Sequence, residues 1–270
     1  IFAVIFCAYK AERIFMILAI DMGNTNIVVG GIDENKIYFL ERITTDRAKT
    51  DLEYAVSIKS ILEIHKLESS DIEGAILSSV VPPLNQAVAL AVKKITNIDC
   101  LMVNYKMNMA GLKIKVENPA GLGSDLIVDS VAAISEYQPP LAVIDLGTAT
   151  TISVVDKENN YLGGVIHPGL RVSLDTLSSK AAQLPFIDLE APGRIIASGT
   201  VESMRSGILY GHAGTLDGCI EQMEKELGSK LTAVATGGLA RFVLPLCRHQ
   251  IIMDDNLLLK GLLRLYRENA

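Results

Sequence analysis

The chain has 270 residues, of which 49% are hydrophobic and 21% are charged. This composition is typical of a globular protein and excludes a disordered chain. The formal net charge of −6 argues against nucleic acid or an anionic membrane as a partner. The 4 cysteines and 4 histidines are scattered and form no CxxC pair, so we expect no zinc site, reduced thiols and a cytoplasmic location.

The first fifteen residues differ from the rest of the chain. An apolar run over residues 1–9 precedes Lys10 and Arg13, which is the reverse of the order in a signal peptide. The run is also shorter than the ~20 apolar residues of a membrane span. Met16 then opens a strong strand pattern. We therefore expect the native chain to start at Met16 and residues 1–15 to be an upstream, non-native extension.

A pattern near the start of the chain recurs in its middle. Residues 18–31 (LAIDMGNTNIVVGG) and 142–155 (AVIDLGTATTISVV) each run from an apolar strand through Asp-x-Gly and Thr into a second strand. A polar turn and a third short strand follow each of them, which is a hairpin pattern. Asp21 and Asp145 are corresponding positions. Although short β patterns recur by chance, two similar half-molecules are the more economical interpretation.

Helical and strand patterns alternate through the rest of the chain. Further strands are expected at residues 72–81, 101–103 and 231–235, and helices at 51–65, 84–96, 124–137, 200–226, 239–246 and 257–267. The glycines of the helix at 200–226 are expected to break it. The alternation predicts an α/β fold of two similar domains, residues 16–134 and 135–270, with the last helix able to pack back on the first domain.

The two Asp-Gly-Thr turns are candidate phosphate-binding segments. Glycine lets an anion approach backbone N–H groups, and Thr and Asn side chains add donors for phosphate oxygens. The aspartates before the turns, Asp21 and Asp145, can hold a cation. Two such turns that face each other can clamp a triphosphate. A third segment, ATGGLA at residues 235–240, follows a strand and opens a helix, which suits a nucleoside.

Two other nucleotide motifs are excluded. The chain has no GxxxxGK[ST] segment, so it is not a P-loop protein. Residues 121–126 begin like GxGxxG, but Leu126 stands at the third glycine position and Pro119 breaks any strand before it. A dinucleotide site is therefore not predicted.

Residues 123–129 (GSDLIVD) are the candidate site for a phosphate acceptor. Ser124 is expected to cap a helix that begins at Asp125. Beside the positive helix end, Asp125 should stay ionised and can take a proton from a substrate hydroxyl as general base. Asp129 lies one turn further on the same face, and repulsion between the two carboxylates can raise one pKa. The pattern alone favours the alternative of a purely structural first-turn aspartate.

Together these motifs resemble the type III pantothenate kinases, over nearly all of residues 16–270. The matching segments, in order, are DMGNT, TDR, SSVVPP, ENP, DLGTAT, GGVI with PG, TVESM and ATGGLA. The resemblance implies two actin-like or sugar-kinase-like (ribonuclease H-like) domains with ATP in the cleft between them. It implies transfer of the γ-phosphoryl group to the 4′-hydroxyl of pantothenate, the first step of coenzyme A synthesis. It further implies a homodimer that uses Mg²⁺ and K⁺ or NH₄⁺.

On the nucleotide side the resemblance is intact. Asp145 matches the monovalent-cation ligand, and Asp21 is a candidate Mg²⁺ ligand. Thr148 matches an ATP contact, and the glycines of ATGGLA should lie near the adenosine. The ATP-binding residues implied in this way are Asp21, Met22, Gly23, Asn24, Thr25, Asn26, Ile27, Val28, Thr148, Gly237 and Gly238.

On the acceptor side the resemblance is weaker. Asp125 matches the catalytic base, and Thr200 matches a substrate contact made across the dimer. The other residues expected at the substrate are Gly123, Ser124 and Leu126. Leu126 stands where the family has an arginine that would help bind the acid substrate, and leucine carries neither charge nor donors. Further departures lie at Val116, where the family usually has tyrosine, at residues 104–106, and at residues 198–199.

Three interpretations follow from these departures. The first is a pantothenate kinase whose acceptor pocket is re-equipped, with Arg47 or Lys106 as a substitute for the arginine. The second is a kinase of the same fold for another small alcohol. The third is a catalytically weak ATP-binding regulatory paralogue.

A face of small residues is the candidate dimer contact. Glycines on one side of a helix permit close approach of a second helix, and the family dimerises nearby. Packing within one chain is the alternative. The residues concerned are Gly207, Gly211, Gly214 and Gly218.

Overall fold

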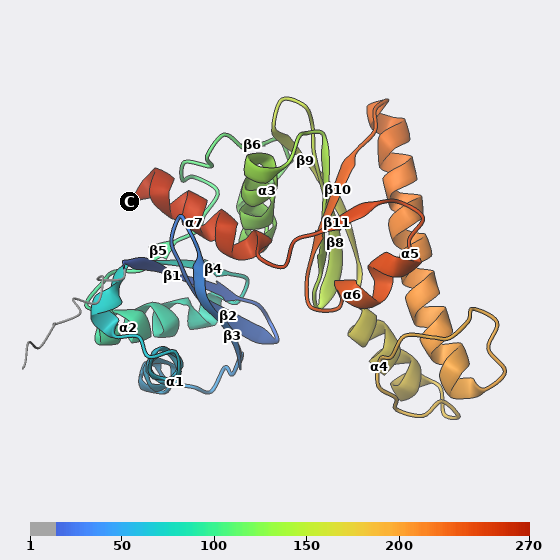
Figure 1. The fold of residues 1–270 in the computed structure, drawn as a ribbon, viewed down its shortest axis with the longest axis horizontal. Helices are drawn as coiled ribbons and strands as arrows, with labels where there is room; N and C mark the ends of the chain where they lie inside the picture. The colour runs from blue at the N-terminus through green and yellow to red at the C-terminus, as the bar shows by residue number, and fades with distance from the viewer. Residues whose placement is uncertain (1–14) are drawn as a thin grey trace, which may run out of the picture.

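The structure is a computed structural model that describes residues 15–270. The apolar run over residues 1–9 and the basic residues after it lie outside this part, and the extension proposed before Met16 stays a prediction. Two mixed β-sheets form the framework, with helices between them and on their outer faces (Figure 1).

The first sheet comes from the N-terminal part of the chain. Its strands are β1 (Met16–Met22), β2 (Asn26–Ile32), β3 (Ile37–Thr44), β4 (Ile72–Ser79) and β5 (Leu101–Met102). They lie in the order β3-β2-β1-β4-β5. The first three strands pair antiparallel, whereas β1, β4 and β5 pair parallel.

The second sheet repeats this arrangement. Its strands are β6 (Lys113–Ile114), β7 (Leu141–Leu146), β8 (Ala149–Val155), β9 (Asn160–Pro168), β10 (Thr232–Thr236) and β11 (Ile251–Met253). Their order is β11-β10-β7-β8-β9-β6. Read from the other edge, β9-β8-β7-β10-β11 corresponds to β3-β2-β1-β4-β5 of the first sheet, and β6 is an additional edge strand. The pairing also repeats, antiparallel for β7, β8 and β9 and parallel for β7, β10 and β11. The α/β fold of two similar halves, predicted from the repeated hairpin, is confirmed.

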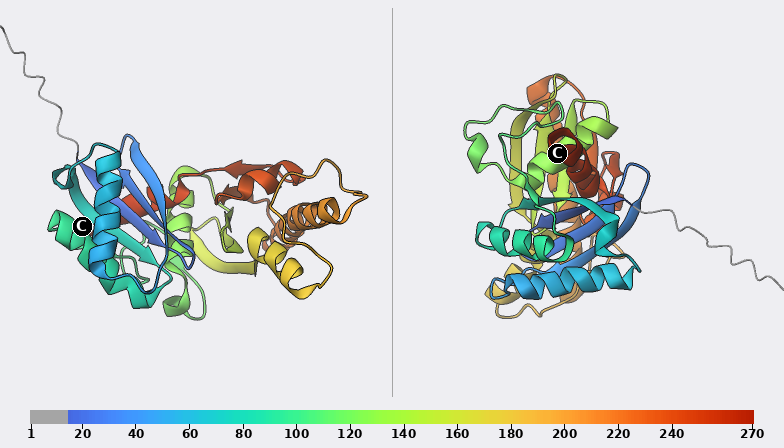
Figure 2. Two further views of the ribbon diagram at one scale, coloured as in Figure 1. Left: turned by 90° about the horizontal axis from the view of Figure 1, so that it is seen from below. Right: turned by 90° about the vertical axis from the view of Figure 1, so that its left-hand side faces the viewer.

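Helices separate and cover the two sheets. α3 (Ser124–Glu136) and α7 (Leu257–Asn269) lie between them (Figure 1), and the left view of Figure 2 shows the same arrangement from below. α1 (Asp51–Ile64) and α2 (Asn85–Thr96) cover the far face of the first sheet. α4 (Leu170–Lys180), α5 (Thr200–Leu227) and α6 (Ala240–Val243) cover the outer face of the second. Short 3₁₀ helices lie at Ser69–Asp71, Pro82–Leu84, Pro119–Gly121 and Leu244–Leu246.

The alternation of side chains along β1 explains this layering. Ile17 and Ala19 face α3 and α7, whereas Leu18 and Ile20 face α1 and α2. A strand buried on both faces needs apolar residues at every position, and all four residues are fully buried. The last helix, α7, therefore packs against the first sheet although it follows the second in sequence.

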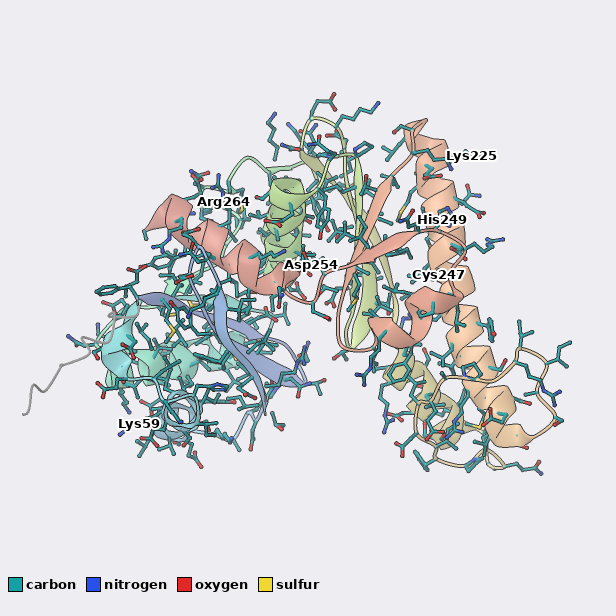
Figure 3. All side chains as sticks on the ribbon, viewed as in Figure 1. Lys59, Lys225, Cys247, His249, Asp254 and Arg264 are labelled. Atoms are coloured by element: carbon teal, nitrogen blue, oxygen red, sulfur yellow. The ribbon has the colours of Figure 1, made fainter. Side chains whose placement is uncertain are left out.

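One carboxylate fixes the start of α7 beside the end of α3. Asp254 lies in the segment that leads into α7 (Figure 3). It accepts hydrogen bonds from the backbone N–H of Asn256 at 3.0 Å, from Lys260 Nζ at 2.9 Å and from Tyr137 Oη at 2.9 Å. Because Tyr137 directly follows α3, these bonds hold the two central helices together at one end.

Several predicted elements differ from the structure. The helix at 200–226 is continuous as α5 and is not broken by its glycines, because a row of buried apolar side chains packs it on the second sheet. The helix at 239–246 is divided into α6 and a 3₁₀ turn. α4, β6 and β11 had no predicted counterpart. The proposed domain boundary after residue 134 falls in the last turn of α3, and the domain limits stay a prediction.

Candidate active site

The two Asp-Gly-Thr turns meet in the structure. Asp21 stands near the end of β1 and Asp145 near the end of β7, each before the turn to the next strand. Thr25 Oγ1 and Thr148 Oγ1, one from each turn, lie 3.0 Å apart. Thr45 supports the first turn, since its hydroxyl donates to the carbonyl oxygen of Gly23 at 2.7 Å. Both threonines of the contact are exposed, so their hydroxyls are open to a ligand.

The ATGGLA segment lies directly beside the second turn. β10 runs parallel to β7, with Thr236 opposite Asp145. Gly237 follows with φ of 102°, a conformation that other residues rarely adopt. A Cβ atom there would come within 2.6 Å of the Leu146 carbonyl oxygen, so the close approach requires glycine. The structure thus brings the three predicted nucleotide segments to one end of the sheets.

Asp125 lies in the first turn of α3. Its carboxylate accepts a hydrogen bond from the backbone N–H of Leu126 at 2.9 Å and folds back against Gly123. A Cβ atom at Gly123 would meet Asp125 Oδ1, so any other residue there would require this carboxylate to turn aside. The helix begins at Ser124, with Gly123 as N-cap residue and no side-chain cap.

The predicted role of Ser124 as N-cap is wrong. Its hydroxyl points to β4, where it accepts from the backbone N–H of Ser79 at 2.8 Å. Ser78, the neighbour on that strand, donates to Asp21 Oδ1 at 2.7 Å. Ser124 was also predicted to lie beside the substrate; its hydroxyl makes these protein contacts and the residue is 8% exposed, and a contact with the substrate stays a prediction.

Four buried carboxylates lie at this end of the sheets, and each has a raised pKa. Burial raises the pKa of Asp21 to about 7, against the hydrogen bond from Ser78 and with repulsion from Asp125. Burial, with repulsion from Asp125 and Asp21, raises the pKa of Asp145 to about 7. Burial also raises the pKa of Asp125, against hydrogen bonds from the backbone N–H groups of Leu126 and Asp125 itself, and the ionised state expected for it stays a prediction. Asp129 has its pKa raised well above the usual value by burial and then by repulsion from the other three.

The aspartates at this end of the sheets fit a cation that is bound jointly by protein carboxylates and by the phosphates of a nucleotide. Within residues 15–270, no three Asp, Glu, His or Cys side chains converge to form a metal site of their own. Mg²⁺ bound with a nucleotide needs only one or two carboxylates, because phosphates and waters complete its shell. Asp21 and Asp145 can each supply one, and Asp129 Oδ1 is buried without a hydrogen-bond partner nearby. A cation at this end would offset the carboxylate repulsion.

A cavity of about 270 Å³ has Leu126, the residue after Asp125, in its wall. None of its lining side chains carries a charge, and neither Arg47 nor Lys106 is among them. Thr151 Oγ1 in its wall is buried and has no hydrogen-bond partner. The lining residues are Val116, Asn118, Gly121, Leu122, Leu126, Thr151, Ile152, Ser153, Tyr161, Gly163, Gly164, Val165 and Ile166.

Thr200 is not brought to this site within one chain. It is the first residue of α5, which begins at the end of the molecule away from α3 in both Figures 1 and 2. It lines a separate shallow hollow with Leu177 and Met204.

Three polar residues of the site had no predicted role. They are Ser78 beneath Asp21, Thr45 beneath the first turn, and Thr151 in the cavity wall. Ser78 and Thr45 stand in segments (SSVVPP and TDR) that carry the family resemblance, which was the available signal. Their partners are far away in sequence, so spacing could not reveal the contacts.

The repeated sheets define the class of protein. The fold is that of the actin-like and sugar-kinase-like proteins. Component A of (R)-2-hydroxyglutaryl-CoA dehydratase from Acidaminococcus fermentans matches with a TM-score of 0.57 and 15% identity, over 93% of this chain and 97% of that one. A ROK hexokinase from Thermus thermophilus matches with a TM-score of 0.51 and 13% identity, over 94% and 98%.

Sequence comparison narrows the class to one family. Residues 17–222 match the profile of type III pantothenate kinase. A type III pantothenate kinase from Bacillus cytotoxicus is 43% identical over 255 residues, which cover 94% of this chain and 97% of that protein. The chain belongs to the type III pantothenate kinase family. No helix among residues 15–270 is long and apolar enough to cross a membrane.

Proposed function

We propose that this protein transfers the γ-phosphoryl group of ATP to the 4′-hydroxyl of pantothenate. The observation that carries the proposal is that Asp125 lies close enough to Asp21 and Asp145, which precede the two turns, to raise their pKa values, and directly precedes Leu126 in the cavity wall. A phosphate donor at the turns and an alcohol acceptor in the cavity would then both lie near one carboxylate. Membership of the family supports the same substrates.

The residues of the two turns position the nucleotide. Thr25, Asn24 and Thr148 offer side-chain donors to the phosphates, and the backbone at Gly237 and Gly238 lies where the nucleoside would rest. A Cβ atom at Gly238 would meet nothing, so this backbone is open to a ligand. Bound Mg²⁺ would neutralise charge on the phosphate oxygens, with Asp21 as its proposed protein ligand.

Asp125 is the proposed general base. The acceptor oxygen forms a bond to the γ-phosphorus, the bond to the β–γ bridging oxygen breaks, and ADP leaves with those electrons. The hydroxyl proton moves to the Asp125 carboxylate. Burial raises the pKa of Asp125 and so makes it a better base than an exposed aspartate.

A monovalent cation is the proposed partner of Asp145. Burial and repulsion from Asp125 and Asp21 raise its pKa to about 7, so a bound K⁺ or NH₄⁺ would relieve an unfavourable charge. The cytoplasmic location expected from the cysteines stays a prediction.

The absence of charged side chains from the cavity wall supports a second candidate acceptor, an alcohol without a carboxylate. Pantothenate carries a carboxylate, and the cavity wall within one chain offers only hydroxyl and amide groups to it. A kinase of the same fold for an uncharged alcohol is therefore the alternative function. A screen of acceptor alcohols would separate the two.

A homodimer is proposed on the second sheet's side of the molecule. Large apolar side chains are exposed there, including Ile166 at 77%, Ile196 at 82% and Phe186 at 76%. The glycine face of α5 is open, since a Cβ atom at any of its four glycines would meet nothing. A partner would cover these surfaces and could bring Thr200 to the other subunit's acceptor site. A monomer at micromolar concentration in light scattering would contradict this arrangement.

Acceptor-dependent ADP release tests the function. We expect turnover of Mg-ATP that needs both pantothenate and K⁺ or NH₄⁺. Asp125→Asn should abolish turnover but retain ATP binding, whereas the exposed Asp175→Asn should behave like wild type. Turnover without pantothenate, or full activity of Asp125→Asn, would overturn the proposal. ATP binding with no pantothenate turnover would favour another acceptor or the regulatory paralogue.

A further inference from the structure

A chain of hydrogen bonds joins the first sheet to the start of α3. Ser78 stands beside Asp21 in the parallel pairing of β4 with β1. Its Oγ donates to Asp21 Oδ1 at 2.7 Å and lies 3.0 Å from Ser124 Oγ. Ser124 Oγ accepts from the backbone N–H of Ser79 at 2.8 Å and donates to the Ser79 carbonyl oxygen at 3.0 Å. Ser78 and Ser124 are here called the serine bridge.

The serine bridge is closed to solvent. Ser78 is 0% exposed and Ser124 is 8% exposed, so water cannot readily replace a lost hydroxyl contact. The two hydroxyls have two protons, and three kinds of oxygen atom can accept them: Asp21 Oδ1, the Ser79 carbonyl oxygen and the hydroxyl oxygen of the other serine. With an ionised Asp21 as the strongest acceptor, Ser78 donates to it, and the single Ser124 proton is shared between Ser78 Oγ and the Ser79 carbonyl oxygen, each 3.0 Å away. The geometry of both hydroxyls therefore depends on Asp21.

Apart from those of Ser124, the first turn of α3 makes few hydrogen bonds to the rest of the protein. Gly123, its N-cap residue, makes no side-chain hydrogen bond. Asp125 bonds only to backbone of its own turn among the interactions described. Ser124 is the residue of this turn that is bonded to another element, and it precedes Asp125 directly.

We propose that Ser78 and Ser124 are positioning residues that hold Asp125 in register with Asp21. The inference rests on the proposed function, in which Asp21 faces the phosphates and Asp125 the acceptor hydroxyl. These two aspartates come from different elements, so their separation needs a fixed link. A misplacement of about 1 Å between reacting groups can cost up to about a hundredfold in rate.

Serine-to-alanine variants test the bridge against a matched control. Ser130 is also on α3 and fully buried, but its hydroxyl has no hydrogen-bond partner nearby. We expect Ser124→Ala and Ser78→Ala each to lower kcat about tenfold or more, with KM for ATP nearly unchanged. The double variant should lose little more than either single one, because both break one link. Ser130→Ala should match wild type, and Ser124→Thr should recover most of the lost kcat.

A second readout does not depend on the acceptor. Hydrogen exchange of the amides at residues 125–129 should be faster in Ser124→Ala than in Ser130→Ala, with or without turnover. If wild type fails to phosphorylate pantothenate, the proposed function fails, while the exchange experiment still tests the bridge. Equal exchange in the two variants, unchanged kcat in Ser124→Ala, or multiplicative losses in the double variant would overturn the inference. If Ser78→Ala does not fold, Ser124→Ala and Ser124→Thr carry the test.

Discussion

Thr25 Oγ1 and Thr148 Oγ1 lie 3.0 Å apart, although 123 positions separate the two residues in the chain. Thr25 belongs to the first hairpin of the first sheet, and Thr148 to the equivalent hairpin of the second. Their contact is thus the point at which the two repeats meet beside Asp21 and Asp145. A triphosphate bound between the turns would replace this mutual hydrogen bond and receive one from each hydroxyl.

Removal of either hydroxyl should weaken ATP binding. Thr25→Val and Thr148→Val keep the side-chain shape and remove the donor. Since a hydrogen bond to a charged group contributes about 1.5–3 kcal/mol, we expect each variant to lose about tenfold or more in affinity. Calorimetric titration with a non-hydrolysable ATP analogue measures this. Thr215→Val is the control, because that hydroxyl donates to Gly211 within α5. Wild-type affinity in both site variants would place the nucleotide elsewhere.

The stability of the ligand-free protein should fall as pH rises. Burial and carboxylate repulsion raise the pKa of Asp145 to about 7 from 3.8, and burial with repulsion from Asp125 does the same for Asp21. Between these values the folded protein binds more protons than the unfolded chain, so the free energy of unfolding decreases with rising pH. The contribution of the neutral Asp21 and Asp145 side chains to the free energy of unfolding is fully present below about pH 4 and is lost above about pH 7.

The variant Asp145→Asn isolates this effect. Asparagine stays neutral, so the variant should be more stable than wild type at pH 8 and about equally stable at pH 4. Thermal unfolding across this range gives the difference in Tm at each pH. A difference that does not change with pH would contradict the raised pKa. Mg-ATP with K⁺ should stabilise wild type more than the variant, because only wild type has the Asp145 carboxylate that is the proposed ligand of the monovalent cation.

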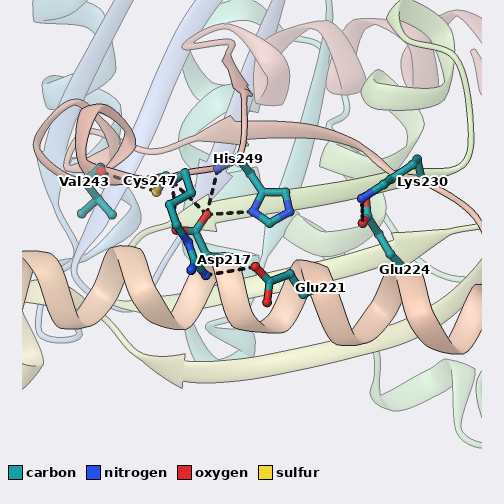
Figure 4. A network of polar contacts seen from close by, with 8 residues as sticks. Asp217, Glu221, Glu224, Lys230, Val243, Cys247 and His249 are labelled. Carbon is teal, nitrogen blue, oxygen red and sulfur yellow. Dashed lines mark hydrogen bonds and ion pairs between the residues drawn. The ribbon is translucent and has the colours of Figure 1, made fainter.

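A buried aspartate fastens the segment before β11 to α5 (Figure 4). Asp217 accepts from the backbone N–H groups of Arg248 at 2.9 Å and His249 at 3.0 Å, and from His249 Nδ1 at 2.8 Å. Burial opposes its ionisation, but these bonds hold the pKa of Asp217 below its usual value. This contribution to stability is therefore present above about pH 4 and is lost as pH falls through the lowered pKa.

Asp217→Asn should destabilise the fold by about 3 kcal/mol, because the donors around it lose a charged acceptor. Glu221→Gln is the matched control on the same helix. Glu221 pairs with Arg248 at 3.0 Å, but both side chains are more than half exposed, so its loss should cost at most about 1 kcal/mol. Urea unfolding compares the two variants. Equal destabilisation would show that the buried bonds contribute no more than the surface pair.

The sequence predicted what depends on near neighbours and missed what depends on distant ones. The hairpins around Asp21 and Asp145 were readable, because turn residues and strand alternation lie within a few positions of each other. The link from Ser78 to Ser124 spans 46 positions and exists only once β4 and α3 pack together. The burial that raises the pKa of Asp125 could not be predicted for the same reason. The first-turn position was visible in the sequence, whereas the burial that raises the pKa comes from the rest of the fold.

The acceptor can be identified through Leu126. This residue lines a cavity without charged side chains, and an arginine there would offer a carboxylate a paired set of donors. If pantothenate is the acceptor, Leu126→Arg should lower its KM by about tenfold or more, as expected for a charge-assisted contact of about 1.5–3 kcal/mol, and leave KM for ATP unchanged. Steady-state ADP release measures both constants.

The matched comparison uses an acceptor without charge. Pantothenol has an alcohol in place of the pantothenate carboxylate, so Leu126→Arg should give it no advantage, and Leu126→Gln should help neither compound much. Improvement confined to pantothenate would show that the carboxylate lies beside residue 126. Equal improvement for both compounds would contradict a charge contact. If Leu126→Arg loses activity toward pantothenate but not toward pantothenol, the wild-type cavity already binds the carboxylate through other groups, and the arginine occupies that position.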